Sequence, residues 1–234
     1  MVKTDLQLIA QSYDRTIDYG RNGIDLYKDL PESITDEPAY SKWKEELERG
    51  SEGSGGAAVK AYLSPDAKKK FIDLGCSLNL MFHGYGQWPS LYHGVDISEQ
   101  TIQLLYEYTA TQELPVGSLY CGGIHETPFE DDCFDIGACI GVLEYFEADY
   151  VRKALWEIHR IMRPGGKFVL DIPNISSSSG KIMMMIETYM GRPVRFEMQS
   201  HDFEDMLGPY FEIVENGRDD RESMSFMYYL SCKK

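Results

Sequence analysis

Residues 71–80 read Phe-Ile-Asp-Leu-Gly-Cys-Ser-Leu-Asn-Leu, and this stretch decides the fold class. A short apolar strand ends in an acid and then in Gly75, which allows the backbone to approach a nucleotide closely. Turns of this kind usually carry two further glycines, but Ser77 and Asn79 stand in their places. The stretch therefore indicates either a cofactor turn with altered chemistry or a turn that has lost its cofactor.

From residue 71 onward, strand patterns and helix patterns alternate. The clearest helix runs over residues 151–162, and Arg163-Pro-Gly-Gly166 ends it. Strands separated by helices are typical of a parallel, doubly wound sheet. The predicted strands of this part of the chain are 71–74, 92–97, 118–121, 134–141 and 167–172.

The C-terminal residues depart from this alternation. Phe211–Glu215 and Met224–Cys232 both read as strands, and only a short polar loop separates them. A loop of that length has no room for a crossover helix, so the two strands should pair as an antiparallel hairpin. The sequence thus predicts one α/β domain with a seven-stranded, mostly parallel sheet.

The N-terminal residues form a separate region, predicted as a helical cap with its connection over residues 1–56. Thr4 and Gln7 fit a capping box that begins the first helix, and a second helix is expected over Ala39–Arg49. The Gly-rich segment Gly50–Gly56 is either a mobile lid or a plain linker, and the linker interpretation is favoured. Residues 57–234 would then form the cofactor-binding domain.

A methionine-rich helix is predicted between the fifth strand and the hairpin, within residues 175–200. Met183, Met184 and Met185 give this helix an adaptable apolar surface. The segment either covers the substrate as an insertion or packs as ordinary core.

The amino-acid composition disfavours several classes of binding partner. The 234 residues carry 23 basic and 38 acidic side chains and a net charge of −15, which repels nucleic-acid phosphates. No apolar run reaches the roughly 20 residues of a membrane span, and no signal-peptide core begins the sequence. The five cysteines lack Cys-x-x-Cys spacing, which fits a reducing cytoplasm and gives no zinc signature. We therefore expect a cytoplasmic protein with a small-molecule partner and no bound metal, nucleic acid or membrane.

Asp96 is the strongest single candidate for a binding role. It ends the second strand in Gly94-Val-Asp-Ile-Ser98, 23 residues after Asp73. A carboxylate at this position can accept hydrogen bonds from both hydroxyls of a ribose. The alternative is an acid that only caps the next helix, and the coincidence with the glycine turn favours the ribose role.

Five segments in this order resemble the class I S-adenosylmethionine-dependent methyltransferases. Two of them are those already quoted, around Gly75 and around Asp96. The others are Thr127-Pro-Phe-Glu-Asp-Asp-Cys-Phe-Asp135, Val142-Leu-Glu-Tyr145, and the run from Leu155 through Arg163-Pro-Gly-Gly166 to Leu170. The resemblance covers residues 71–172 and implies a Rossmann-like fold, with S-adenosyl-L-methionine as cofactor.

The resemblance assigns cofactor contacts to the loops that follow the first four strands. Those positions here are Asp73, Gly75, Cys76, Ser77, Asn79, Asp96, Ile97, Ile124, His125, Gly141 and Val142. Gly123 stands where the family usually has an acid that contacts adenine, so the backbone of Ile124 and the side chain of His125 are expected to serve instead. Tyr145 and His125 are the candidates for a catalytic role, and no dedicated base is identified.

The function expected from these features is transfer of a methyl group to a small molecule. Its acceptor atom could be nitrogen, oxygen, sulfur or carbon, and nothing in the sequence bears on oligomeric state. One alternative is a module that binds the cofactor without turnover, which the altered turn favours. The other is a nicotinamide-dependent dehydrogenase, which the missing third glycine and the terminal hairpin disfavour.

Overall fold

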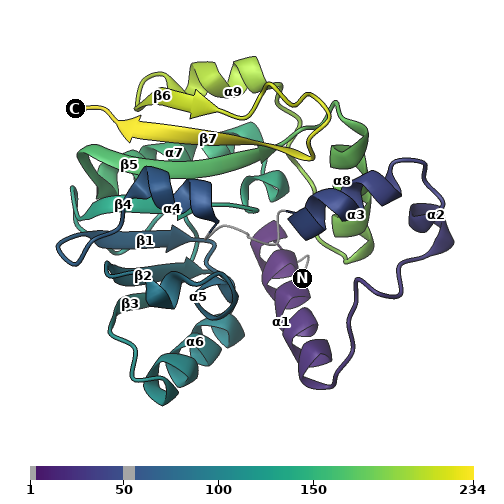
Figure 1. Cartoon of the computed structure of the whole chain (residues 1–234), viewed down its shortest axis with the longest axis horizontal. Coiled ribbons are helices and arrows are strands. Elements are labelled where there is room, and N and C mark those ends of the chain that lie inside the picture. The colour runs from purple at the N-terminus through teal and green to yellow at the C-terminus, as the bar shows by residue number, and fades with distance from the viewer. Residues whose placement is uncertain (1–3, 50–55) are drawn as a thin grey trace.

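One seven-stranded sheet organises the computed structural model, which describes residues 4–49 and 56–234 (Figure 1). The strand order is β3-β2-β1-β4-β5-β7-β6. Neighbours from β3 to β5 run parallel, whereas β7 is antiparallel to both β5 and β6. This arrangement confirms the predicted fold class and the terminal hairpin. The strands are β1 (Lys70–Leu74), β2 (Leu91–Asp96), β3 (Val116–Cys121), β4 (Phe134–Cys139), β5 (Met162–Pro173), β6 (Phe211–Asn216) and β7 (Ser225–Cys232).

Helices cover both faces of the sheet in the described part of the chain. They are α1 (Asp5–Arg21), α2 (Glu32–Thr35), α3 (Tyr40–Arg49), α4 (Ala57–Leu63), α5 (Asn79–Phe82), α6 (Glu99–Thr111), α7 (Ala148–Ile161), α8 (Ser178–Tyr189) and α9 (Ser200–Leu207), with short 3-10 turns η2 (Tyr85–Gln87) and η3 (Leu143–Tyr145). Apolar side chains of α4, α5 and α6 pack on one face, and those of α7 and α9 pack on the other. The central strands β1 and β4 are therefore buried on both sides, as their apolar sequences require.

The order of the strands creates a crevice between β1 and β4. The chain adds β2 and β3 on one side of β1, and then returns to place β4 on its other side. Loops at the carboxyl ends of β1 and β4 leave in opposite directions at such a point, and ligands of open α/β sheets bind there. The fold thus brings the turn after β1 and the loop after β4 to one place.

Helix α1 lies beyond the end of the sheet toward which β1 points (Figure 1). The predicted capping box at its start is confirmed, because the Thr4 side chain accepts from the Gln7 backbone and the Gln7 side chain accepts from the Thr4 backbone. A separate apolar cluster joins α2, α3 and α8, with Trp43, Ile182 and Ile186 at its centre. The methionines 183–185 lie half-buried at its edge.

The start of the fifth strand differs from its sequence-based prediction. Strand β5 begins at Met162, not Lys167, because Met162 already pairs with Phe134. The next residue pair is Lys167 opposite Ile136, so the register shifts between them. The Pro-Gly-Gly segment, which was predicted to end the helix, therefore lies inside the strand as an irregular segment, with Gly165 at φ +76°.

Apart from Gly56, the Gly-rich connection lies outside the described residues. None of the described helices is long and apolar enough to cross a membrane.

Candidate active site

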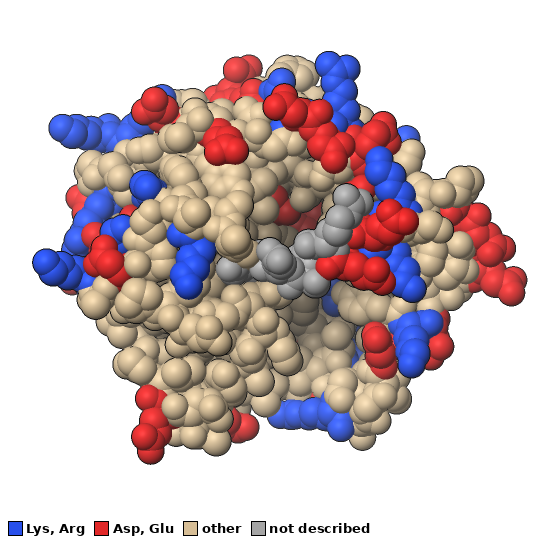
Figure 2. All heavy atoms as spheres, viewed as in Figure 1, with Lys and Arg blue, Asp and Glu red and all other residues tan. Residues whose placement is uncertain are grey.

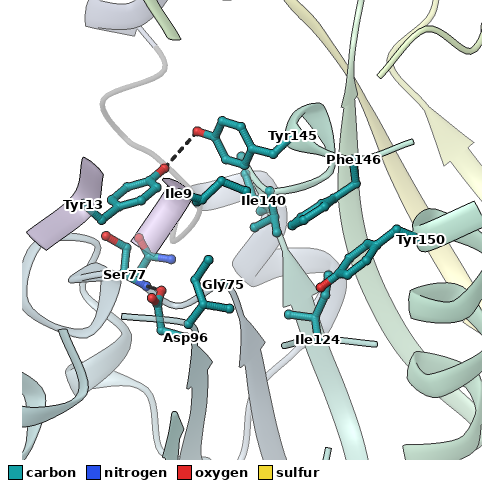
Figure 3. Close-up of a pocket in the computed structure, with 14 residues that line it drawn as sticks. Ile9, Tyr13, Gly75, Ser77, Asp96, Ile124, Ile140, Tyr145, Phe146 and Tyr150 are labelled. Carbon is teal, nitrogen blue, oxygen red and sulfur yellow. Dashed lines mark hydrogen bonds between the residues drawn. The ribbon is translucent and has the colours of Figure 1, made fainter. Parts of the chain in front are cut away.

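A pocket opens at the crevice between β1 and β4, under α1 (Figure 3). It encloses about 770 Å³, counting the space at its open mouth. The lining residues are Ile9, Tyr13, Gly75, Ser77, Asn79, Asp96, Ile97, Ile124, Ile140, Gly141, Val142, Tyr145, Phe146 and Tyr150.

Gly75 is required by the close approach of two loops. Its φ is +74°, and a Cβ atom built on it would lie 2.3 Å from Cγ2 of Val142. A side chain at position 75 would therefore be strained and would also collide with the loop after β4. The bare backbone leaves the floor of the pocket open between the two loops.

Ser77 adopts the backbone conformation for which the family uses glycine. Its φ is +39°, a conformation that is uncommon for a residue with a side chain. Its N–H donates to Oδ2 of Asp96 over 2.8 Å. The turn therefore keeps the shape of a glycine turn and uses its backbone to orient the acid of the next strand.

Asp96 is held by the backbone on both sides of its carboxylate. Oδ2 accepts from Ser77, and Oδ1 accepts from the N–H of Ser98 over 2.8 Å. The side chain is only 8% exposed, and burial raises its pKa to about 6 against the opposing effect of these two hydrogen bonds. Each carboxylate oxygen retains a second lone pair. Asp96 can therefore accept two more hydrogen bonds from a ligand in the pocket.

Asn79 is oriented by a neighbouring acid. Its side-chain amide donates to Oδ2 of Asp73 over 3.2 Å, and Tyr92 donates its hydroxyl proton to the same oxygen over 2.9 Å. One amide proton of Asn79 is therefore directed at Asp73. The other proton remains available at the pocket wall.

Three of the predicted contact residues lie outside the pocket lining. Asp73 is buried beneath the turn, and burial raises its pKa to about 7. Cys76 is also fully buried, and burial raises the pKa of its thiol. His125 lies behind Tyr150, whose hydroxyl is 3.1 Å from its Nδ1. The structure brings the other eight predicted cofactor positions together around one cavity.

Helix α1 contributes a wall that the sequence motifs did not predict. Ile9 and Tyr13 face the cavity, and Tyr13 meets Tyr145 with 2.9 Å between their hydroxyl oxygens (Figure 3). The apolar spacing that placed residues 9 and 13 on one helix face was the available signal. Their partner across the pocket is 132 residues away in sequence, and no local pattern indicates it.

A buried ion pair supports this tyrosine pair. Tyr145 donates its proton to Oε2 of Glu187 over 2.8 Å, and Arg192 donates to the same oxygen over 2.7 Å. The Arg192 guanidinium also lies over the ring of Tyr13, 4.1 Å from its centroid. Burial raises the pKa of Tyr145 well above its usual value, so its hydroxyl is neutral and it does not act as a base at neutral pH.

The comparisons with known proteins agree with this geometry. A family model described as a methyltransferase domain matches residues 72–170, the segment from β1 to β5. Residues 72–170 belong to the methyltransferase domain family. The resemblance stated from the sequence is thereby confirmed for this segment. S-adenosylmethionine is the cofactor that such a domain implies.

Solved structures similar to the methyltransferase domain extend the match to most of the chain. A protein of Pyrococcus horikoshii aligns with a TM-score of 0.58 at 19% identity, over 85% of this chain and 94% of that one. A geranyl diphosphate C-methyltransferase of Streptomyces coelicolor, solved with its substrate and S-adenosyl-L-homocysteine, gives a TM-score of 0.60 at 13% identity, over 83% of each chain. Identities this low show a shared fold.

Curated relatives match a smaller region. An uncharacterised methyltransferase of Bacillus subtilis is 24% identical over 104 residues, which is 44% of this chain and 40% of that protein. The chain thus spans less than half the length of the first curated relatives it matches. The segments before and after the methyltransferase domain, including α1 and the residue pair Glu187 and Arg192, lie outside the family model.

Proposed function

We propose that this protein transfers a methyl group from S-adenosylmethionine to a small molecule. The observation that carries the proposal is the fixed orientation of the Asp96 carboxylate in the pocket wall. Its carboxylate is fixed by two backbone N–H groups and lines the pocket with acceptor capacity to spare. A preorganised acid at the end of β2 suits the two hydroxyls of a ribose.

The neighbouring residues fit the remainder of such a cofactor. Ile97 and Ile124 offer apolar surface beside Asp96 for a planar base, and both line the pocket. The open backbone at Gly75 and the end of β4 at Gly141 provide the narrow space that the methionine part would need. The amide of Asn79 is a donor at the same end of the cavity.

The bound cofactor would supply a methyl group that its sulfonium already activates. The chain's own residues then need to orient the acceptor and exclude water, and proximity supplies most of the rate. Ile9 and Tyr13 of α1 close the pocket above the turn after β1. Among the described residues, Asp96 is the one charged side chain that lines this pocket, and the other ionisable groups in the lining are tyrosines. We therefore assign no dedicated base.

A small acceptor fits the place and charge of the site. The pocket lies in the crevice between β1 and β4, where ligands of open α/β sheets bind, and the net charge of −15 disfavours nucleic acids as substrates. On the face drawn in Figure 2, Lys and Arg side chains lie scattered among acidic ones, and a broad uncharged surface lies beside the central hollow. The cysteines are free thiols, as expected in a reducing cytoplasm.

Residues outside the matched domain would complete the site. Helix α8 carries Glu187, which anchors Tyr145, so the segment at 175–200 supports one pocket wall. Helix α1 supplies another wall. We infer that the N-terminal cap and this insertion serve the acceptor, while the domain at 57–234 holds the cofactor.

A second candidate is a module that binds the cofactor without turnover. The strained backbone at Ser77 and the absence of a base among the lining residues favour it. Both functions predict that the chain binds the cofactor, but only the first predicts methyl transfer. Measuring binding and transfer together therefore separates them.

The decisive experiment combines binding with transfer. Calorimetric titration of the full chain with S-adenosylhomocysteine should give binding that Asp96→Ala weakens. Incubation with methyl-labelled S-adenosylmethionine and a metabolite extract should then give a labelled small molecule. Binding without label transfer would favour the non-catalytic module. No binding by the wild-type chain would overturn both candidates.

A further inference from the structure

The direction of the hydrogen bonds between Tyr13, Tyr145 and Glu187 limits what the pocket can accept. Glu187 is paired with Arg192 over 2.7 Å, so it is a carboxylate and can only accept. Tyr145 therefore donates its single proton to Glu187. It has no proton left for Tyr13.

Tyr13 must in turn donate its own proton to Tyr145. The two hydroxyl oxygens are 2.9 Å apart, and only Tyr13 has a proton free for that bond. Burial raises the pKa of Tyr13, which keeps the proton on its oxygen. The oxygen of Tyr13 thus meets the pocket solely as a hydrogen-bond acceptor, and a ligand can pair with it only by donating a proton.

The hydroxyl of Tyr13 points away from the ribose-binding end. In Figure 3, Tyr13 lies above Ser77, and its hydroxyl is directed away from Ser77 and Asp96 toward Tyr145. Ile9, Ile140 and Phe146 line the pocket beside the tyrosine pair. The charge of Arg192 lies behind the ring of Tyr13 and is already compensated by Glu187. This half of the pocket therefore favours an uncharged molecule with an apolar body.

We propose that Tyr13 is the docking and specificity residue for the methyl acceptor, which is an uncharged small molecule that presents an O–H or N–H proton to the Tyr13 oxygen. The proposal rests on the proposed function, because it assumes that the cofactor occupies the Asp96 end. The bond would direct the acceptor's hydrogen toward α1. The lone pair of the acceptor atom would then be free to face the methyl group. The methyl–sulfur bond would break as the new bond forms, leaving S-adenosylhomocysteine, and the proton released from the acceptor would pass to water at the open mouth of the pocket.

The test compares two probes that differ by one proton donor. Para-cresol carries a phenolic O–H, and its methyl ether carries only an acceptor oxygen. Both are titrated into the full chain saturated with S-adenosylhomocysteine. Wild type should bind para-cresol about 2- to 10-fold more tightly than the ether, which is the usual value of one neutral hydrogen bond.

Two variants test the direction of the bonds. In Tyr13→Phe the preference for para-cresol should disappear. In Tyr145→Phe, Tyr13 no longer has an acceptor for its proton and can donate to the ether, so the preference should shrink because the ether gains affinity. Tyr62→Phe is the matched control, since its hydroxyl bonds the Leu230 carbonyl away from the pocket, and it should keep the wild-type preference.

Each outcome bears on one of the two proposals. Three results would overturn the role of Tyr13. The preference could be equal in wild type and Tyr13→Phe, it could be absent in wild type, or both probes could fail to bind the S-adenosylhomocysteine complex. Failure of S-adenosylhomocysteine to bind the wild-type chain would instead overturn the proposed function. Binding of S-adenosylhomocysteine by Tyr13→Phe, with an unchanged circular dichroism spectrum, serves as the folding control.

Discussion

At the scale of single residues, Asp96 is already in position before any ligand binds, because Ser77 and Ser98 hold both of its oxygens. Asp96→Ala should weaken S-adenosylhomocysteine binding at least about tenfold. Hydrogen bonds to a charged acceptor contribute roughly 1.5–3 kcal/mol each, and about 1.4 kcal/mol is tenfold in affinity. Calorimetry measures the change, with circular dichroism as the folding control. A folded variant that binds like wild type would remove the ribose role.

The same carboxyl should make cofactor binding depend on pH. Burial raises the pKa of Asp96 to about 6, so a proton competes with the ribose hydroxyls in acid. Between pH 7.5 and pH 5 the ionised fraction falls, and S-adenosylhomocysteine affinity should fall by about tenfold. Asp96→Asn should bind weakly at both pH values, with a flat profile. Equal wild-type affinities at the two pH values would contradict this assignment.

Replacing Ser77 with glycine tests whether the backbone of the altered turn is strained. A side chain in this left-handed conformation costs about 1–2 kcal/mol, and the extra freedom of glycine in the unfolded chain offsets roughly 0.5–1 kcal/mol of that. Ser77→Gly should therefore raise the free energy of unfolding by about 0.5 kcal/mol. Cofactor affinity should stay the same, because glycine keeps the N–H that orients Asp96.

Ser64 provides the matched comparison for this change. It has φ +49° at the exposed end of α4, outside the pocket lining. Ser64→Gly should give a similar gain in denaturant unfolding and no change in calorimetric titration. A loss of S-adenosylhomocysteine affinity in Ser77→Gly alone would show that the Ser77 hydroxyl itself contacts the cofactor.

At the scale of elements, α1 is held by bonds to two separate parts of the chain. Ser12 donates to the Met190 carbonyl after α8, and Ser98 at the start of α6 donates to Asp14. If α1 closes over the ligand, S-adenosylhomocysteine should slow amide hydrogen exchange across residues 5–21 several-fold. Helix α9 contributes no residue to the described pocket lining and should exchange equally in both states. Unchanged exchange in α1 would leave it as a fixed structural helix.

Local patterns predicted the elements better than the boundaries between them. Glycine and acid at the ends of β1 and β2 were sufficient to predict residues that line one end of the pocket, because those residues act within their own turns. The Met162–Phe134 pair could not be predicted, since it depends on which residues of β5 meet β4 in space. The tyrosine wall depends on Tyr13 meeting Tyr145 and Glu187, which three separate elements bring together.

At the scale of the whole molecule, several buried acids should make the ligand-free protein more stable in mild acid. Burial raises the pKa of Asp73 to about 7 and that of Asp96 to about 6, so the folded state binds more protons than the unfolded state between pH 4 and pH 7. Their contribution to stability is present below pH 4 and is lost as pH rises through that window. Burial lowers the pKa of His93 to about 4, which acts in the opposite direction below pH 6.5.

The acids outweigh the histidine by about 1 kcal/mol between pH 7.5 and pH 5.5. Thermal unfolding at constant ionic strength should therefore give a midpoint roughly 2–4 °C higher at pH 5.5. Asp73→Asn removes the contribution of Asp73 and should shrink the difference to zero or reverse it. A higher midpoint at pH 7.5 in the wild-type chain would mean that these carboxyls are ionised in the folded state.

The placement of α1 also sets an order of events during synthesis. Tyr13 leaves the ribosome early, but the residues that fix it, Tyr145, Glu187 and Arg192, are made 132 to about 180 residues later. At about 5–20 residues per second, α1 waits on the order of 10–40 s before its partners exist. If synthesis stopped before Arg192, the turn after β1 would already have been made, but α1 would not yet be fixed over the pocket.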